Sequence, residues 1–374
     1  MNNVYVKYNS FKNFINNKNF LIENIKKLID TNFDYQNSNS SDYKKKILLE
    51  FKKDFDEGKF LLNSNVISEL VTIDESRILD YLFHRYRYEV FPKKFILDDY
   101  PPCLQIEPTS ICNYRCIFCY QTDENFNKKS NGHMGSMSFD LFKKIIDEVE
   151  GKVEFITLAS RGEPLMNKYI IKMLDYSKDK FLNLKINTNA SVLTEEKSHA
   201  ILRNNVKTLV ISADSADEEN YSKLRVNGDL KKILKNIEIF NNIKKKYYPK
   251  SKIITRVSGV KVNENQNIIK MESFWKDLVD QVAFVNYVPW ENVYLNKDTH
   301  IDNPCSDLWR RVFVWFDGSV NPCDVDYKST LKVGDVNNST LFSLWKSEVY
   351  QTMRYKHLNN QRKKLNPCRK CNVI

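Results

Sequence analysis

From residue 103 onward, short apolar runs alternate with longer stretches whose apolar residues recur every three to four positions. The short runs predict β-strands, and the longer spacing predicts amphipathic helices. Strands that alternate with helices in this way form a parallel, curved sheet whose functional site lies at the strands' carboxyl ends. The predicted strands cover residues 104–107, 153–158, 182–186, 206–211, 253–260 and 282–288, and the predicted helices follow Ser138 and Thr194 and cover 169–176, 230–246 and 268–278.

Two regions outside this alternation have patterns of their own. Helical spacing recurs at 20–29, 43–60 and 74–88, so residues 1–97 are predicted to form a helical accessory region. After residue 300, a hairpin is predicted at 312–320 around the turn Asp317-Gly318, and a helix begins at Leu341. The sequence therefore predicts an accessory region at 1–97, an α/β domain at 98–300 and a small α+β domain at 301–374.

The composition is typical of a globular chain. Of its 374 residues, 42% are apolar, which is enough for a large buried core. No uncharged apolar run of about 18 residues occurs and the start lacks an apolar stretch, so we expect a cytoplasmic protein without membrane insertion. The net charge of +11 is spread along the chain, which favours an ordinary solvated surface. The tail after residue 350 is the exception, because its basic residues could face a phosphorylated substrate or offset a negatively charged site.

Three of the eight cysteines lie close together, as Cys112, Cys116 and Cys119. Disulfides are not expected in a reducing compartment, so this spacing indicates metal ligation. Four thiolates close a zinc or iron-sulfur site, whereas three leave one iron of a four-iron, four-sulfur cluster without a protein ligand. A zinc knuckle or three unrelated buried thiols are the alternatives.

With Phe118 before the third cysteine, this spacing resembles the signature of the radical S-adenosylmethionine (radical SAM) enzymes. The resemblance implies a partial (β/α)6 barrel and a 4Fe-4S cluster whose open iron is chelated by SAM. It also implies that one electron from the cluster, delivered by a donor such as a flavodoxin or ferredoxin, cleaves SAM to methionine and a 5′-deoxyadenosyl radical.

The same resemblance assigns SAM contacts to successive strand ends. Ser160, Arg161, Gly162 and Glu163 stand where the family has a Gly-Gly-Glu-Pro turn, with Arg161 in place of the first glycine. Backbone acceptance of the SAM amino group survives this change if the position does not need φ > 0. The other predicted SAM-binding residues are Asn187, Asn189, Ser212, Asp214, Arg225 and Tyr120.

Four further cysteines follow residue 300, and we call Cys305, Cys323, Cys368 and Cys371 the C-terminal cysteine set. From spacing alone, this set could bind either structural zinc or iron. Beside a radical SAM loop it resembles the shortened SPASM module, or twitch domain, which holds one auxiliary 4Fe-4S cluster. Cys103 belongs to neither group. It is predicted to be a buried, inert thiol, with a hydrogen-atom donor as the alternative.

The resemblance implies that the radical takes a hydrogen atom from an unactivated C–H bond of the substrate. Because an auxiliary cluster can accept the remaining electron, oxidation is expected, and Asp324 or Asp326 could remove the accompanying proton. Hydrogen bonding beside Cys323 is the alternative for both carboxylates. The segment 309–330 resembles proteins associated with surface-polysaccharide biosynthesis, which favours dehydrogenation or epimerisation of a sugar or sugar nucleotide.

Two other functions are open. Radical SAM/SPASM proteins also include peptide maturases, which often begin with a β-hairpin and helices that recognise a peptide, and residues 4–8 give only a weak strand signal for such a hairpin. A non-catalytic metal-binding nucleic-acid module would fit the positive charge. Such a module would not require polar residues at the strand ends, so nucleic acid is not expected as a partner.

Overall fold

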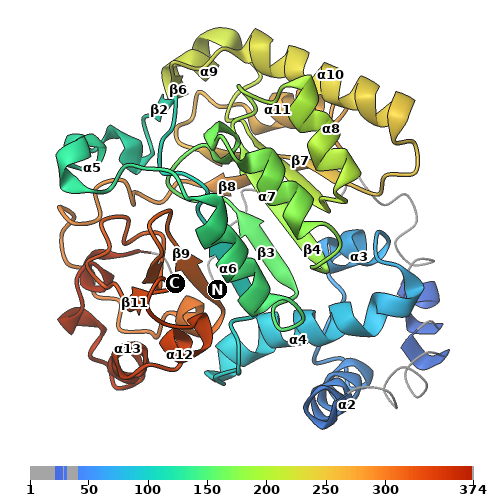
Figure 1. The fold of residues 1–374 in the computed structure, drawn as a ribbon, viewed down its shortest axis with the longest axis vertical. Coiled ribbons are helices and arrows are strands. Elements are labelled where there is room, and N and C mark those ends of the chain that lie inside the picture. The colour runs from blue at the N-terminus through green and yellow to red at the C-terminus, as the bar shows by residue number, and fades with distance from the viewer. Residues whose placement is uncertain (1–21, 28, 32–40, 373–374) are drawn as a thin grey trace.

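A nine-stranded sheet forms the centre of the computed structural model, which describes residues 22–27, 29–31 and 41–372. The strand order is β11-β10-β9-β1-β3-β4-β5-β7-β8 (Figure 1). The strands from β1 to β8 in this order are all parallel and match the six predicted strands to within a few residues, so the predicted α/β class is confirmed. Their bounds are β1 Cys103–Ile106, β3 Phe155–Leu158, β4 Asn183–Thr188, β5 Thr208–Ser212, β7 Ile254–Lys261 and β8 Gln281–Asn286.

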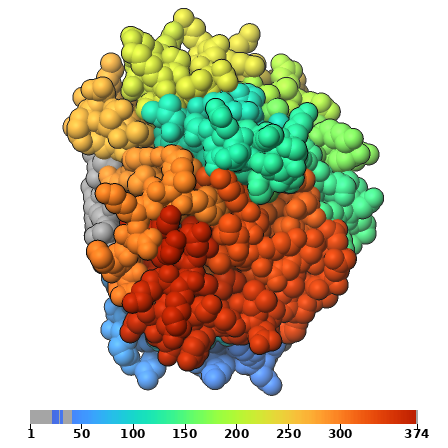
Figure 2. Space-filling view, turned by 90° about the vertical axis from the view of Figure 1, so that its left-hand side faces the viewer, coloured from blue at the N-terminus to red at the C-terminus, as the bar shows by residue number. Residues whose placement is uncertain are grey.

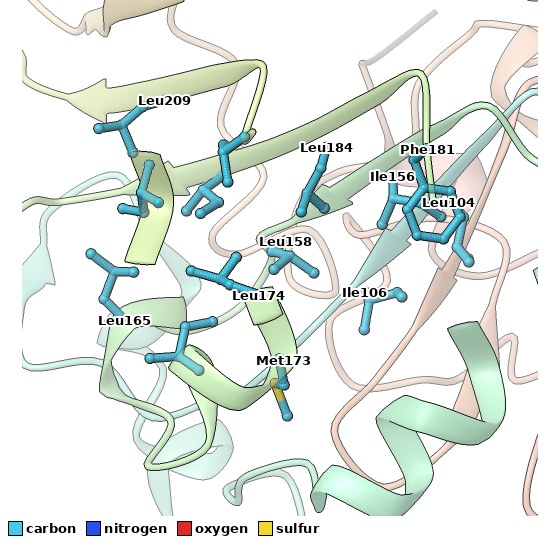
Figure 3. Close-up of a cluster of buried hydrophobic side chains, with 14 of the residues drawn as sticks. Leu104, Ile106, Ile156, Leu158, Leu165, Met173, Leu174, Phe181, Leu184 and Leu209 are labelled. Atoms are coloured by element: carbon cyan, nitrogen blue, oxygen red, sulfur yellow. The ribbon is translucent and has the colours of Figure 1, made fainter. Parts of the chain in front are cut away.

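Helices cover one face of this sheet, which we call the outer face. Alternate strand residues such as Leu104, Ile156 and Leu184 point toward it and pack in one apolar core with the helices (Figure 3). Two predicted N-caps are confirmed, because the hydroxyls of Ser138 and Thr194 accept hydrogen bonds from the N–H groups three residues later (3.2 and 3.3 Å). The helices are α6 Phe139–Val149, α7 Ile170–Ser177, α8 Glu195–Arg203, α9 Glu218–Leu224, α10 Leu230–Tyr247 and α11 Ile268–Trp275.

The opposite face of the sheet, which we call the inner face, is mostly polar. Strand alternation places Gln105, Thr157, Lys185, Arg256 and Gln281 on it. The Arg256 Nε group donates a hydrogen bond to the Gln281 side-chain oxygen (2.8 Å), which links β7 to β8 across this face. Polar side chains in the middle of parallel strands are unusual, because such strands are normally apolar on both faces.

The N-terminal helices lie across the strands' amino ends. These are α2 Asp42–Asp56, α3 Ser64–Leu70 and α4 Ile78–Lys94, preceded by helical residues in 22–27 and 29–31, so the described part of the predicted region is helical. The ring of His84 stacks on Phe155 with centroids 3.7 Å apart, and Arg311 donates from Nη2 to the Tyr88 hydroxyl (3.0 Å). Below β3 and β4 in Figure 1, α4 covers the amino end of the inner face. The weak strand signal at 4–8 lies outside the described residues.

The C-terminal strands extend the central sheet. Strand β9 (Arg311–Val314) pairs in parallel with β1, with Arg311 opposite Cys103, and β10 (Ser319–Asn321) pairs antiparallel with β9. The predicted hairpin is confirmed, with Gly318 at φ +92° in its turn. The chain then forms β11 (Gly334–Asp335), α12 (Leu341–Trp345) and α13 (Glu348–Leu358). Among the described helices, none combines the length and apolarity that a membrane span requires.

Candidate functional site

The loop after β1 holds the three closely spaced cysteines. Within it, β2 (Arg115–Cys116) pairs antiparallel with β6 (Arg225–Val226), so Cys116 lies opposite Arg225. Arg115 donates from Nη1 to the carbonyl oxygen of Cys112 (2.9 Å). The cysteine loop is therefore held by the strand that follows α9 and by one of its own arginines.

The thiols of Cys112, Cys116 and Cys119 share an apolar setting that includes Tyr114 and Phe118. Burial raises the pKa of all three thiols, to about 12 for Cys112. The neighbouring Cys116 and Cys112 thiols raise the pKa of Cys119 further, so the three groups are close enough to affect one another's protonation. None of the eight cysteines forms a disulfide. Three adjacent free thiols are the donor set that an incompletely ligated iron-sulfur cluster needs.

Two predicted SAM-binding residues contact the cysteine sulfurs. The Asn189 amide nitrogen lies 4.0 Å from Cys112 Sγ, and Nη1 of Arg225 lies 3.7 Å from Cys116 Sγ. Arg225 also forms a buried ion pair with Asp214 (Nε to Oδ2, 2.6 Å). Donors directed at sulfur stabilise the thiolate, which is the form that binds iron. The ends of β4 and β5 thus meet the cysteine loop.

The turn at 160–163 packs against the same loop. A Cβ atom on Gly162 would lie 2.3 Å from a backbone carbonyl oxygen, so a larger residue does not fit. The Glu163 carboxylate accepts hydrogen bonds from the Thr188 hydroxyl and the Asn189 N–H (both 2.6 Å), which joins the ends of β3 and β4. Burial raises the pKa of Glu163. Ser160 has a φ of +130°, and its buried hydroxyl has no hydrogen-bond partner in the described chain.

The remaining predicted SAM contacts lie beside this turn and loop. Asn187 is on the inner face near the end of β4, and its buried side-chain oxygen has no partner among the described residues. Ser212 is the last residue of β5, on the same face. Tyr120 begins a 3-10 helix, η3 (Tyr120–Thr122), directly after Cys119, and its ring stacks on Tyr327 with centroids 4.9 Å apart. The predicted SAM contacts are thus gathered at one edge of the sheet.

Arg161, the departure from the family turn, forms contacts that join three parts of the chain. Its Nε and Nη2 donate to the carboxylate of Glu107 (2.7 and 2.6 Å), which directly follows β1. Its Nη1 donates to the Tyr327 carbonyl (2.9 Å), and the guanidinium lies 4.3 Å from the centre of the Trp315 ring. Arg161 is absent from the left-handed backbone region, so this position does not require glycine.

Sequence reasoning missed Glu107 and Gln121 as members of this site. The Gln121 amide nitrogen donates to the carbonyl oxygens of Ser110 (2.8 Å) and Arg161 (2.5 Å), which connects the cysteine loop to the 160–163 turn. Both residues are buried. Their positions in the sequence could have identified them. Glu107 directly follows a buried strand and Gln121 directly follows a metal-binding loop, and a buried polar side chain needs a hydrogen-bond partner.

The C-terminal cysteine set is gathered from three segments. Cys305 precedes η6 (Ser306–Trp309), Cys323 follows β10, Cys368 begins η8 (Cys368–Lys370) and Cys371 directly follows it. Burial raises the pKa of Cys305 and of Cys368 to about 12, and the Cys371 thiol contributes to both shifts. Burial, together with the Cys371 and Cys305 thiols, likewise raises the pKa of Cys323. In the described ranges, no three His, Cys, Asp or Glu side chains are arranged to hold a single metal ion.

Arg362 holds these segments together. This buried side chain donates to the carbonyl oxygens of Cys368 (3.2 Å), Cys371 (2.9 Å) and Asn303 (3.1 Å). Its charge also opposes the rise that burial causes in the pKa of Cys305 and Cys368. At least one residue of the basic tail therefore lies where its charge would stabilise thiolates, in line with one of the two roles that the sequence leaves open.

The two candidate proton acceptors have different surroundings. The oxygens of Asp326 accept hydrogen bonds from the Tyr294 hydroxyl (2.7 Å), the Thr330 hydroxyl (2.7 Å) and backbone N–H groups, so this carboxylate stabilises its own loop. Asp324 has no ion pair of 4 Å or less within the described residues, and it lies near Arg311. Burial raises the pKa of Asp324, against the lowering effect of Arg311. Burial raises the pKa of Asp326 as well, although its hydrogen bonds oppose the rise, so the two carboxyl groups differ mainly in how many hydrogen bonds they accept.

Cys103 lies on the inner face, at the amino end of β1. It is half-buried, whereas the sequence predicts a buried thiol. Its nearest charged neighbours include Lys185 and Arg311, and it is separated along β1 from the cysteine loop. Its role stays a prediction.

Two protein-family models match the chain. The model of the radical SAM superfamily matches residues 106–269, and the model of the SPASM iron-sulfur cluster-binding domain matches residues 305–372. The chain is a radical SAM protein with a SPASM domain. These matches support a radical SAM enzyme that uses SAM and iron-sulfur clusters, and they do not favour a nucleic-acid module. Figure 2 shows the SPASM domain, in orange to red, against the teal segment that follows the cysteine loop.

The relatives of this radical SAM protein differ in activity. It is 26% identical over 209 residues to GTP 3′,8-cyclase of Clostridium botulinum, covering 54% of this chain and 61% of the cyclase. It is 26% identical over 144 residues to mycofactocin maturase MftC of Mycolicibacterium smegmatis, covering 38% and 35%. The chain thus spans less than two thirds of the length of these relatives.

Solved structures share the fold. Streptococcus suis SuiB bound to precursor peptide SuiA aligns with a TM-score of 0.56 and 15% identity over 83% of this chain and 80% of SuiB. BtrN in complex with AdoMet and 2-DOIA aligns with a TM-score of 0.51 and 15% identity over 73% of this chain and 93% of BtrN. At this identity the likeness concerns the fold alone.

Proposed function

We propose that this radical SAM protein is an oxidoreductase that removes a hydrogen atom from a carbon of a sugar or sugar nucleotide. Cys112, Cys116 and Cys119 would hold the SAM-binding 4Fe-4S cluster, and the C-terminal cysteine set one auxiliary 4Fe-4S cluster. When bound, these groups supply a 5′-deoxyadenosyl radical and an acceptor for one electron. Free thiols in apolar settings, with Asn189 and Arg225 directed at sulfur, suit such groups.

Ser160 and Asn187 give the strongest support for SAM binding at the strand ends. Each has a buried oxygen without a hydrogen-bond partner in the described residues, so each can still bind a ligand group. Glu163, Asp214 and Arg225 already have protein partners. We therefore assign the last three mainly to holding the strand ends and the cysteine loop in position.

One observation carries the substrate class, namely the unpartnered amides of the inner face. The Asn183 oxygen, the Gln281 nitrogen and both polar side-chain atoms of Asn321 are buried and lack hydrogen-bond partners among the described residues. Leaving such an atom unpaired costs about 1–3 kcal/mol, so we expect a ligand to pair them in the working enzyme. Sugar hydroxyls both donate and accept hydrogen bonds, and they match amides that come from several strands.

Asp324 is the proposed proton acceptor for the carbon that loses hydrogen. Oxidation of an alcohol carbon releases a hydroxyl proton, and burial raises the pKa of the Asp324 carboxyl, which makes its carboxylate a stronger base. The nearby Arg311 guanidinium opposes this rise and so favours the ionised form, which is the form that accepts a proton. The ring of Tyr120, directly after Cys119, stacks on Tyr327 of the SPASM domain, and this buried contact helps to exclude water from the region.

A peptide maturase is the second candidate. The relationship to MftC favours it, since that relative is named a maturase. A maturase requires a peptide to reach the inner face, whereas α3 and α4 contact the amino end of this face. We therefore rank the sugar oxidoreductase first.

The test is an anaerobic incubation in D2O of the iron-reconstituted protein with SAM, dithionite and a panel of neutral, acidic and phosphorylated sugars and sugar nucleotides. Dehydrogenation lowers the product mass by about two, and epimerisation through a thiol raises it by about one. We expect the decrease in product mass. The turnover rate of Asp324→Asn, relative to the unchanged protein, should be much lower than that of Asp326→Asn. Turnover of a short peptide, with no sugar consumed, would refute the proposal in favour of the maturase.

A further inference from the structure

Lys185 is an ammonium group on the inner face without a counter-ion at hydrogen-bond distance. It is the third residue of β4, between Leu184 and Ile186, which both pack into the outer core. Its side chain is half-buried and forms no hydrogen bond or ion pair within the described part of the chain. Burial lowers the pKa of Lys185, and Arg256 and Arg311 lower it further.

The charged groups around Lys185 come from four other elements, and most already have partners. On β9, Arg311 lies 3.5 Å from Asp307. On α3, the Glu69 carboxylate accepts a hydrogen bond from Tyr81 (2.7 Å). On β7, Arg256 donates to the side-chain oxygens of Gln281 and Asn65. The remaining neighbour is the Cys103 thiol on β1.

This arrangement leaves a positive charge in a partly dehydrated position. A buried charge is costly unless an opposite charge or several hydrogen bonds compensate it. Two residues to either side on the same face of β4, Asn183 and Asn187 each have a buried side-chain oxygen without a partner in the described chain, and these oxygens can accept hydrogen bonds from the hydroxyls of a ligand. The Lys185 ammonium can therefore pair with an anionic group of a ligand, while the two amide oxygens can accept hydrogen bonds from its hydroxyls.

We propose that Lys185 binds an anionic group of the substrate, a phosphate or a carboxylate, and that the substrate is therefore a sugar phosphate or a sugar acid. This inference rests on the proposed sugar oxidoreductase function and narrows its substrate class. The reacting carbon of the bound substrate points toward the cysteine loop. The anionic group lies toward the amino ends of the strands.

The depth of Lys185 limits the size of this substrate. It lies three residues before Thr188, the end of β4, which at about 3.3 Å per residue is roughly 10 Å along the strand. That length suits one sugar ring with one anionic substituent. Beyond Lys185, Asn65 of α3 accepts a hydrogen bond from Arg256 of β7, so α3 contacts the amino end of this face.

The test measures equilibrium binding to the anaerobic, iron-reconstituted, SAM-loaded protein by calorimetry. The probes are glucose 6-phosphate, glucuronate and neutral glucose, at fixed low ionic strength. We expect at least one anionic probe to bind more tightly than glucose, and the stronger of the two identifies the anionic group. In Lys185→Met its Kd should rise by roughly 10- to 100-fold, as for the loss of a hydrogen bond to a charged group.

Two matched variants keep this result interpretable. Lys185→Arg retains the charge and should restore binding to within a few-fold of the unchanged protein. Lys172→Met removes an exposed lysine of α7 and should leave the Kd unchanged. If Lys185→Met is poorly folded, the comparison of Lys185→Arg with Lys185→Gln replaces it, with the melting temperature as the check on folding.

Binding and turnover separate the two hypotheses. Equal affinity for glucose and both anions, or anion binding that Lys185→Met leaves unchanged, overturns the anion site. Tight, Lys185-dependent anion binding without loss of hydrogen from any sugar supports the anion site and refutes the oxidoreductase function. SAM cleavage in the absence of substrate, measured on the same samples, shows that the cofactor site is intact in each variant.

Discussion

The buried ion pair between Arg161 and Glu107 should contribute strongly to stability, and Arg161→Ala tests this. The side chains of Arg161 and Glu107 are 2% and 0% exposed, so the substitution leaves a buried carboxylate without its cation. Removing one partner of such a pair typically costs about 3–5 kcal/mol. It also removes the hydrogen bond to the Tyr327 carbonyl and the contact with Trp315. At about 2 °C per kcal/mol for a large domain, we expect the melting temperature to fall by roughly 6–10 °C.

The matched control is the ion pair between Arg203 and Asp175. It has the same two-pronged Arg–carboxylate geometry, but its side chains are 40% and 46% exposed. Exposed pairs contribute about 0–1 kcal/mol, so Arg203→Ala should lower the melting temperature by no more than about 2 °C. The melting temperatures of both variants are measured by thermal unfolding monitored through tryptophan fluorescence, with and without iron reconstitution. Equal falls for the two variants would refute the argument that burial sets the cost.

A double variant distinguishes the stability lost with the ion pair itself from the stability lost because Glu107 keeps a buried, unpaired charge. Replacing Arg161 by Met and Glu107 by Leu removes both charges, and buried pairs exchanged for apolar residues of similar volume often lose little stability. We expect this double variant to melt above Arg161→Ala. If it melts below, the hydrogen bonds that the Glu107 carboxylate accepts from the backbone N–H groups of Arg161 and Phe316 matter more than its unpaired charge.

Three further predictions concern the metal sites and acid stability. Changing Cys112, Cys116 and Cys119 together to Ala should halve the iron content, from about eight to about four per chain, and abolish SAM cleavage, whereas retained cleavage would overturn the assignment of this loop. In the same triple variant, metal analysis should find iron with sulfide at the C-terminal cysteine set, and about one zinc instead would exclude the auxiliary cluster. Burial by itself would raise the pKa of Glu154, but the charges of Arg87 and His84 lower it to about 2. The native state therefore binds fewer protons than the unfolded state between about pH 4.5 and 2. The stability that this carboxylate contributes is therefore present above about pH 4.5 and is lost as the pH falls toward 2, so urea unfolding of the apoprotein should show the difference between Glu154→Gln and the unchanged protein shrinking over that range.

The sequence predicted the features that depend on local pattern. The alternation of apolar runs and amphipathic helices located all six parallel strands, because period-2 and period-3.6 patterns arise from the elements themselves. The spacing of Cys112, Cys116 and Cys119 identified the family, since ligands on one short loop need no long-range information. The hairpin at 312–320 followed from its Asp-Gly turn in the same way.

Contacts between distant segments could not be read from local pattern. The pairing of Arg311 with Cys103 across β9 and β1 depends on how two parts of the chain dock. The same holds for Arg362, which appeared only as one of several tail cations but donates to three carbonyls around the C-terminal cysteine set. Arg161 was noticed as a departure from the family turn, yet its partner Glu107 lies far away in the sequence, directly after β1.

The pairing of β9 with β1 also affects how the chain can be made. One edge of β1 stays open until the segment containing Arg311 has left the ribosome. At about 5–20 residues per second, the intervening stretch of roughly 200 residues takes about 10–40 s to synthesise. An open strand edge can pair with another chain during that time. The last part of the polypeptide therefore protects the first strand of the sheet from aggregation, and shortened chains that end before residue 311 are expected to collect in inclusion bodies.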